Sequence, residues 1–367
     1  MKKVAVVTTT IRVPEFLKGV SENAARYEKQ DISFYIIGDK KTPNEAIELC
    51  NSLEKEYPYS YNYYSLEDQE KRLSSFQSIL KVIPYNTGVR KLLGNFIAYQ
   101  DGYENIIQLD DDNFVGEDDF FGGHSIVGNE IEMQLIQSES GWYNIYEPLI
   151  EESGIPFFPR GYPWSKREYV ATQNVINKRE KRKVVLVNGL VYEDPDIDAI
   201  SRLFWPIRVV GIQPSFKPNF GLYPGTWGSF NNQNTSISKE LAPIYFTPYS
   251  GARNSDIWTS FVICKLVEQM GDVVAFGSPF VKQFRNPHNL WKDLEDELTS
   301  NKATDTFVSL LRSIDLQEKS YMKLLHELIE KSLVKIASIN DMEEDQLQMI
   351  HNFFSEYKIW ANLFDQS

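Results

Sequence analysis

The stretch Asn105-Ile106-Ile107-Gln108-Leu109-Asp110-Asp111-Asp112 is an apolar run that leads directly into three carboxylates. A short apolar run of this kind predicts a buried strand, Asn105–Leu109. In open α/β sheets, ligands bind outside the carboxyl ends of the strands. We therefore expect Asp110–Asp112 to lie where a ligand binds.

Strands and helices alternate on the amino-terminal side of this stretch, which predicts a parallel, doubly wound sheet. Lys3–Thr9 has a basic start and a short apolar run, but it lacks a small-residue cleavage site and predicts a first strand, not a signal peptide. The other predicted elements are a strand at Ile32–Gly38 and helices at Pro14–Glu28, Asn44–Glu56, Ser65–Val82 and Asn86–Tyr99, the last ended by Gly102.

On the carboxyl-terminal side of this stretch, the sequence first predicts a loop-rich region and then a mainly helical one. Residues 120–247 are rich in Gly, Pro, Trp and Asn, with short strands such as Val184–Val187, which is typical of ordered loops that carry specificity. A helix is predicted from Asp256 to Gly271, followed by a strand at Asp272–Phe276. From Leu294 onward apolar residues recur at helical spacing. We expect two domains, a catalytic domain over 1–298 and a helical subdomain over 299–367.

Composition narrows the class of partner. The chain has 367 residues, 42% of them hydrophobic, and a formal net charge of -13. A charge of this sign argues against nucleic acid or an anionic membrane as the main partner. No stretch approaches the roughly 20 apolar residues that a membrane span needs. Cys50 and Cys264 lack metal-type spacing and are expected to be free, buried thiols, so we expect a cytoplasmic protein.

The aspartate triplet is a costly cluster without a cation, because neighbouring like charges resist joint ionisation. A hard divalent cation with oxygen ligands, Mn²⁺ or Mg²⁺, removes this conflict and can bridge two phosphates. The alternative is a solvated acidic turn or a helix cap. The buried strand before the triplet favours binding of a metal and a diphosphate.

A second cluster, residues 158–168, packs cations and aromatics between turn-forming Pro and Gly. Arg160 or Arg167 could neutralise a diphosphate, and Tyr162 or Trp164 could stack on a base or sugar. The alternative is a surface loop with ordinary ion pairs.

A third stretch, residues 227–235, places amide and hydroxyl groups beside aromatics and suggests a pocket for sugar hydroxyls, although Asn-rich turns have the same composition. Asp256 opens a predicted helix, either as a catalytic carboxylate or as an ordinary helix N-terminal charge. His288 follows a predicted strand end and either completes the metal site or is structural.

The chain resembles the reversibly glycosylated polypeptide family, which includes plant UDP-arabinopyranose mutases, and is similar to the related STELLO-type glycosyltransferase-like proteins. The resemblance is spread over residues 3–296, and its most specific segment is Pro159-Arg160-Gly161-Tyr162-Pro163-Trp164-Ser165. Further matches lie at 188–190, 195–199, 256–258 and 285–288. The chain departs from the plant proteins at Asn113, where they have cysteine, and at His288, where they have an apolar residue.

The resemblance implies a GT-A-type, Rossmann-like α/β fold that binds a nucleotide-sugar, with a mixed central sheet. It also implies a UDP-sugar or similar donor and a divalent metal at the aspartate triplet. In that family the arginine matching Arg160 becomes reversibly glycosylated and is needed for mutase activity. The expected site residues are Arg160 and Asp256 as catalytic groups, Thr8, Arg90, Asp110, Asp111, Arg167, Trp227 and Asn232 at the donor, and Asp110, Asp112 and His288 at the metal.

These features lead us to expect a glycosyltransferase that breaks the sugar–diphosphate bond with metal assistance and passes the sugar to a carbohydrate or other acceptor in glycan biosynthesis. One alternative is a mutase that interconverts pyranose and furanose rings of the bound donor. Another is a non-catalytic subunit that keeps the fold to bind a partner enzyme. We also expect a homo-oligomer or a complex with other glycan-biosynthesis enzymes.

Overall fold

The strand that precedes the aspartates is β4 (Asn105–Leu109), and all five of its residues are buried. The computed structural model describes residues 3–167, 174–217, 219–285, 289–339 and 342–366. Strand β4 lies beside β1 (Val4–Thr10), followed by β2 (Ile32–Gly38) and β3 (Ser60–Tyr64), and all of these pairs are parallel. The predicted parallel beginning is therefore confirmed.

The sheet changes direction on the other side of β4. Strand β11 (Asn234–Ser238) runs antiparallel to it, so the carboxyl end of β4 meets the loop that enters β11. The remaining strands are β5 (Asn113–Val115), β6 (Glu130–Ser138), β7 (Leu149–Glu151), β8 (Val175–Glu193), β9 (Val209–Ile212), β10 (Asn219–Leu222) and β12 (Val273–Gln283). The described strands form one sheet, in which ten follow the order β3-β2-β1-β4-β11-β8-β6-β10-β12-β5, while β9 pairs with β8 and with β7.

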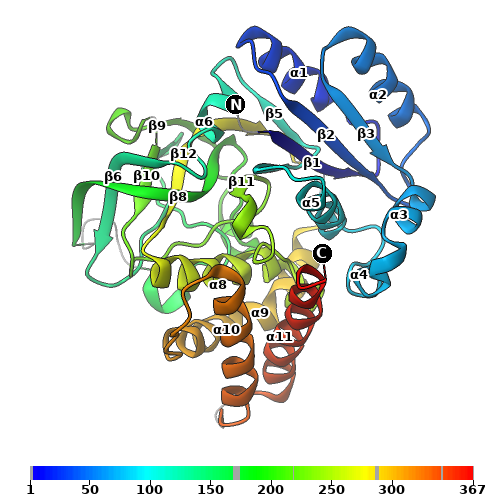
Figure 1. Cartoon of the computed structure of the whole chain (residues 1–367). Helices are drawn as coiled ribbons and strands as arrows, with labels where there is room; N and C mark the ends of the chain where they lie inside the picture. Colours follow the sequence, from blue (N-terminus) through cyan, green and yellow to red (C-terminus); the bar gives the residue numbers. More distant parts are fainter. Residues whose placement is uncertain (1–2, 168–173, 218, 286–288, 340–341, 367) are drawn as a thin grey trace.

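Helices cover both faces of the parallel half (Figure 1). Alternate residues of β1 enter different cores, because successive side chains of a strand point to opposite faces. Val6 packs with residues of α1 and α2, while Val7 packs with residues of α5. The helices up to residue 204 are α1 (Phe16–Arg26), α2 (Glu45–Glu56), α3 (Leu66–Arg72), α4 (Gln77–Val82), α5 (Lys91–Gln100), α6 (Phe120–His124) and α7 (Ala199–Phe204), of which α6 packs mainly on β12 and α7 on the carboxyl-terminal helices.

Two predicted elements differ from the structure. The helix expected at 65–82 is divided into α3 and α4 by a short 3₁₀ turn at Ser74–Phe76. Its start is as expected, because the Ser65 hydroxyl oxygen accepts a bond from the Asp68 N–H and the Asp68 carboxylate accepts one from the Ser65 N–H, a capping box. The strand expected at 184–187 is the buried centre of β8, which is 19 residues long.

Three long helices form the carboxyl-terminal part, α9 (Leu290–Arg312), α10 (Tyr321–Ile336) and α11 (Glu344–Phe364). They pack against α8 (Ser255–Met270), which Gly271 ends with a left-handed φ of 73°. Trp258 of α8 stacks on Phe307 of α9 with ring centroids 4.3 Å apart. The predicted boundary between residues 298 and 299 falls inside α9, and these helices share one hydrophobic core with the sheet.

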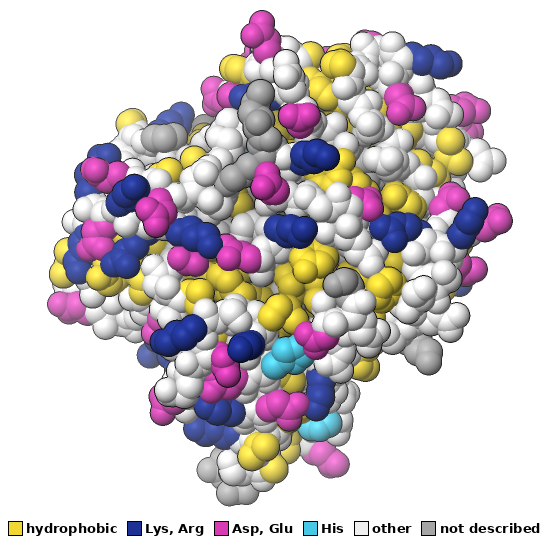
Figure 2. Space-filling model, viewed as in Figure 1, with side chains coloured by type: hydrophobic (Ala, Val, Ile, Leu, Met, Phe, Trp, Pro, Cys, Tyr) yellow, Lys and Arg dark blue, Asp and Glu magenta, His cyan; other side chains and the backbone are white. Residues whose placement is uncertain are grey.

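The mixed sheet, its parallel half and the carboxyl-terminal helices confirm the predicted α/β class with a mixed central sheet. Cys50 and Cys264 are free and buried, as expected. Across the described ranges, no helix combines the length and the apolar character needed to cross a membrane. Figure 2 shows acidic and basic side chains interspersed on one face of the molecule, without a field of a single sign.

Candidate active site

One cavity brings together most of the residues singled out in the sequence. It has a volume of about 480 Å³ and is lined by the aspartate triplet, Arg160, Asp256 and Asn232. The aspartates follow β4, and Asp256 lies in the first turn of α8. The remaining lining residues are Thr9, Gly88, Val89, Lys91, Asp196, Asn231, Gln233, Thr247, Ala252, Arg253, Ser255, Gln283 and Arg285.

Asp110 is held by a buried cation. The Lys91 ammonium, whose side chain is only 3% exposed, pairs with the Asp110 carboxylate and donates to the Asn232 carbonyl at 2.9 Å. The Asp110 N–H donates to the Gln233 carbonyl at 2.9 Å, which fixes the end of β4 against the loop before β11. Lys91 therefore offsets one negative charge of the triplet.

Asp111 and Asp112 have polar partners and raised pKa values. Thr10 donates its hydroxyl to Asp111 at 2.7 Å, and the Gln283 amide donates to Asp112 at 3.2 Å. Burial raises the pKa of Asp112 to about 6, and the charges of Asp110 and Asp111 add to this rise. Burial is also the main reason that the pKa of Asp111 is raised. Both carboxylates would gain from a nearby cation.

The donor set agrees with a hard cation, because the triplet supplies carboxylate oxygens only. Asp110 and Asp112 line the same cavity, and Asp112 forms no ion pair within the described ranges. The side chains of the triplet nevertheless have separate partners, and the described residues contain no group of three or more His, Cys, Asp or Glu arranged around one metal position. His288, the further ligand expected from the sequence, lies outside the described residues.

Arg160 is enclosed by two carboxylates. Its Nε donates to Asp196 at 3.0 Å, and its Nη2 donates to Asp196 at 2.9 Å and to Asp256 at 3.0 Å. Its Nη1 donates to Asp256 at 3.1 Å and to the Arg253 carbonyl. Gly161, with a φ of 67°, allows this close packing, because a Cβ there would lie 2.5 Å from Ile257 of α8.

The two carboxylates around Arg160 differ in acidity. Burial raises the pKa of both, and Arg160 opposes this effect. Asp196 also faces Arg285 and accepts a bond from Asn231, so its pKa is lowered overall, whereas the pKa of Asp256 remains raised. Burial alone would lower the pKa of Arg160, but the two carboxylates outweigh it and raise that pKa. Asp256 is therefore the better proton acceptor of the two.

A continuous hydrogen-bond chain joins this network to the aspartate triplet. Asn231 donates to Asp196 at 2.9 Å and to the Gln233 side chain at 2.8 Å. Gln233 donates to Gln283 at 3.1 Å, and Gln283 donates to Asp112. The side chains on both sides of the cavity are therefore fixed relative to one another.

Two predicted donor-binding residues lie next to lining residues but do not line the cavity. Thr8 is 1% exposed, and its neighbours Thr9 and Thr10 face the cavity and Asp111 instead. Arg90 is also 1% exposed and donates to Gln69, while the next residue, Lys91, reaches Asp110. In both cases the sequence indicated the segment but not the side chain that faces inward.

Arg167 and Trp227 lie elsewhere. Arg167 pairs with Asp198 at 2.6 Å and stacks on Trp164. Trp227 is 1% exposed, and its indole N–H donates to Glu268 at 2.8 Å. Trp227 does not line this cavity, because the aromatic cluster with Trp142 and Arg312 encloses the indole, and its contact with a donor stays a prediction.

Several lining residues were not predicted. Asn231 and Gln233 belong to the amide-rich stretch that the sequence indicated, and Asp196 lies in a segment of the family resemblance. Lys91 and Gln283 carried no signal, because one lies in a helix and the other at a strand end remote in sequence from Asp110–Asp112.

Comparisons with known proteins add a partial family match. The model of the STELLO glycosyltransferases matches residues 253–366, a segment that contains Asp256, Arg285 and the three carboxyl-terminal helices. The match thus extends beyond the resemblance at residues 3–296. No curated protein is significantly similar to the chain in sequence.

Solved structures give distant similarities. A mycobacterial protein is 10% identical, covers 84% of this chain and 75% of its own, and has a TM-score of 0.40. S. aureus TarS 1–349 is 8% identical, with coverages of 99% and 91% and a TM-score of 0.38. The mannosyltransferase PcManGT from Pyrobaculum calidifontis, in complex with GDP-Man and Mn²⁺, is 9% identical, with coverages of 100% and 88% and a TM-score of 0.40.

Proposed function

We propose that this chain is a glycosyltransferase that cleaves the sugar–diphosphate bond of a nucleotide-sugar and transfers the sugar to an acceptor. The observation that carries the proposal is the single cavity that contains the aspartate triplet and a carboxylate with a raised pKa, Asp256. The partial match to STELLO glycosyltransferases, which begins at residue 253, supports the same activity. A UDP-sugar is the donor that the sequence resemblance favours.

Asp256 is the proposed general base. Its raised pKa suits proton transfer, and its side chain lines the cavity. In the proposed reaction the acceptor hydroxyl oxygen attacks the anomeric carbon while its proton passes to Asp256. The bond to the diphosphate breaks, and the nucleoside diphosphate leaves with the electron pair. Such a single displacement inverts the anomeric configuration.

Arg160 is proposed as a positioning residue. It holds both oxygens of Asp256 and fixes the direction in which the remaining lone pairs point. Its Nε, Nη1 and Nη2 nitrogens all donate to protein oxygens, which leaves the guanidinium poorly placed to become glycosylated. This arrangement supports transfer to an external acceptor over the self-glycosylating mutase.

Asp110 and Asp112 are the residues proposed to hold Mn²⁺ or Mg²⁺, with Asp111 beside them. A bound divalent cation would neutralise charge on the leaving diphosphate. Without a donor, Lys91 and Gln283 hold the two carboxylates in place. Retention of the whole cluster argues against a non-catalytic subunit.

Calorimetry with UDP and GDP tests the proposal, with and without Mn²⁺. We expect Mn²⁺-dependent binding of one nucleotide to the unmodified chain and its loss in Asp112→Asn. Asp272→Asn is the matched control, because the pKa of Asp272 is also raised but its side chain does not line this cavity. If neither nucleotide binds, or if Asp112→Asn binds normally, the metal assignment is wrong.

Transfer itself is tested with nucleotide-sugars selected by thermal shift in Mn²⁺, since ligand binding raises the apparent stability of the folded state. Slow release of free sugar without an acceptor supports a transferase. Accumulation of ring isomers of the donor would instead support the mutase.

A further inference from the structure

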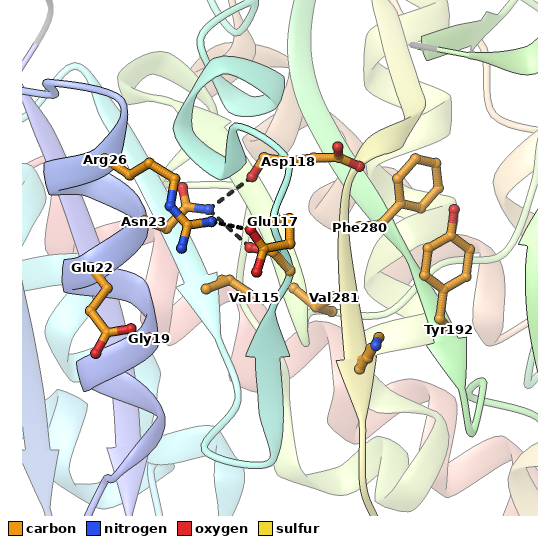
Figure 3. Close-up of a pocket in the computed structure, with 12 residues that line it drawn as sticks. Gly19, Glu22, Asn23, Arg26, Val115, Glu117, Asp118, Tyr192, Phe280 and Val281 are labelled. Atoms are coloured by element: carbon orange, nitrogen blue, oxygen red, sulfur yellow. Dashed lines mark hydrogen bonds and ion pairs between the residues drawn. The ribbon is translucent and has the colours of Figure 1, made fainter.

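A second cavity lies outside the candidate active site. It has a volume of about 390 Å³, within the range of small-ligand sites. Figure 3 shows α1 on one side, the segment after β5 in the middle, and Tyr192 and Phe280 on the other side. We call this cavity the outer groove, lined by Gly19, Glu22, Asn23, Arg26, Val115, Gly116, Glu117, Asp118, Tyr192, Phe280, Val281 and Lys282.

The wall on the α1 side is fixed by hydrogen bonds. Asn23 donates to the Gly116 carbonyl at 3.1 Å and to the Asp118 carbonyl at 2.8 Å. Arg26 pairs with Glu117 at 2.6 Å, as Figure 3 shows. These contacts tie the segment after β5 to α1, so a ligand would meet a largely preformed surface.

The opposite wall is aromatic. Tyr192 of β8 and Phe280 of β12 stack with ring centroids 4.8 Å apart and an interplanar angle of 10°. Val115 and Val281 lie between the two walls in Figure 3. The outer groove therefore offers apolar contact area along one side and along its floor.

Polar side chains that form no hydrogen bond or ion pair among the described residues surround this apolar surface. The side chains of Glu22, Asp118, Tyr192 and Lys282 line the outer groove and make no hydrogen bond or ion pair with any residue that the structure describes. Two of these groups are acceptors, one is a donor and one, the Tyr192 hydroxyl, is both. They are available to a ligand that carries donors and acceptors.

This combination matches a neutral carbohydrate. A sugar ring presents apolar C–H groups to aromatic faces, and its hydroxyls donate to carboxylates and accept from ammonium groups. An anionic ligand is disfavoured, because Glu22, Glu117 and Asp118 outnumber Arg26 and Lys282.

The outer groove and the active-site cavity share two chain segments. Strand β12 lines the outer groove with Phe280, Val281 and Lys282, and the next residues, Gln283 and Arg285, line the active-site cavity. Likewise, Asp110–Asp112 line the active-site cavity, and the outer groove begins at Val115. Lys282 and Gln283 are adjacent, and Asp112 and Val115 are three residues apart. At about 3.3 Å per strand residue, the residues that line the two cavities are therefore separated by roughly 10 Å or less along each segment.

We propose that the outer groove binds neutral oligosaccharide and holds a distal part of a glycan acceptor whose end reaches the active-site cavity. The acceptor role rests on the proposed glycosyltransferase function, whereas carbohydrate binding in the outer groove does not. The acceptor is thus an extended glycan chain and not a single small molecule.

Saturation-transfer NMR tests binding with the full chain and no donor. The probes are neutral linear hexasaccharides of glucose, mannose, xylose and N-acetylglucosamine. We expect at least one probe to bind, and Phe280→Ala to weaken it by about tenfold through loss of ring contact. Asp118→Ala, an exposed position, should weaken binding without changing the melting temperature.

Phe204→Ala is the control, because Phe204 is a 79% exposed aromatic outside the outer groove. Absence of binding by all four probes would overturn the proposal, and so would binding that Phe280→Ala and Asp118→Ala both leave unchanged. Calorimetry with Mn²⁺ and nucleotide on the same variants separates the two proposals. If nucleotide fails to bind while hexasaccharide binds in the outer groove, the result contradicts the acceptor role but supports carbohydrate binding in the outer groove.

Discussion

The Arg160 guanidinium lies between Asp196 and Asp256, with its Nη2 atom 2.9 Å from one carboxylate and 3.0 Å from the other. Arg160 comes from the aromatic loop before β8, and Asp256 from the first turn of α8. The arginine therefore fixes the proposed base and joins two parts of the chain that are 96 residues apart.

Replacement of Arg160 should destabilise the protein. Arg160→Ala leaves the buried Asp256 without its ion-pair partner and Asp196 with Arg285 alone, and loss of one partner of a buried pair typically costs about 3–5 kcal/mol. Arg160→Lys should lower the free energy of unfolding by a smaller amount, because the positive charge remains. It should still lower it, because lysine lacks the planar set of donors of the guanidinium. Urea unfolding measures both losses of stability, with Arg208→Ala as the control, since the two ion pairs of Arg208 are exposed to solvent and should contribute little. An Arg160→Ala variant of unchanged stability would contradict the buried network.

Arg160 should not become glycosylated. After incubation with nucleotide-sugars and Mn²⁺, intact-mass measurement and peptide mapping should find no pentose or hexose on this residue, because its donors are held by Asp196, Asp256 and Arg253. An adduct on Arg160 that disappears in Arg160→Lys would contradict this prediction and favour the mutase.

Asp256→Asn should remove the base without removing the donor site. We expect the turnover rate to fall by about 10²–10⁴-fold, since this is the usual contribution of a general base. The dissociation constant of nucleotide with Mn²⁺ should change little. Asp272→Asn serves as the control in the same transfer assay. If the dissociation constant of nucleotide rises by the same factor by which the turnover rate falls, Asp256 contributes to donor binding and not to proton transfer.

Trp227→Ala should affect stability but not donor affinity. The indole is buried, donates to Glu268 and stacks with the Arg312 guanidinium 4.0 Å from its ring centroid. Removal of a buried tryptophan side chain typically costs about 3–5 kcal/mol. Urea unfolding and nucleotide calorimetry at a temperature where the variant is folded separate the two effects. Weaker nucleotide binding by the folded variant would instead indicate that Trp227 contacts the donor.

His124 should make the protein less stable in mild acid. Burial lowers the pKa of His124 to about 3, and the neutral ring contacts Ser236 and Asn234. Between pH 3 and about 6.5 the unfolded chain binds a proton that the folded chain excludes, so stability rises with pH there and is lost as pH falls. This slope reaches about 1.4 kcal/mol per pH unit.

Asp112 contributes a slope of the opposite sign. Its folded pKa of about 6 lies above the ordinary value, so stability falls as pH rises from about 4 to 6. His124→Gln isolates the histidine: the gain in unfolding free energy from pH 5 to pH 7 should be about 2 kcal/mol larger in the unmodified chain. Equal gains in the two proteins would show that His124 does not control this pH range.

The sequence by itself determined the parallel half of the sheet and the place of the aspartates. Apolar runs separated by helices specify β1, β2 and β4, and carboxylates directly after β4 must emerge at its carboxyl end. The start of α3 and the end of α8 were also encoded locally, by the Ser65 capping box and by Gly271. Local patterns suffice here because helices, strands and caps depend on residues close in the chain.

Only the tertiary structure decided which polar side chains meet. Gln283 reaches Asp112 across 171 residues, because β12 pairs with β5 and brings its end beside the triplet. Asp196 reaches Arg160 across 36 residues, and no periodicity indicates that contact. Burial then set the acidities: it is the main cause of the raised pKa values of Asp112 and Asp256, although the neighbouring charges of Asp110 and Asp111 add to the rise at Asp112.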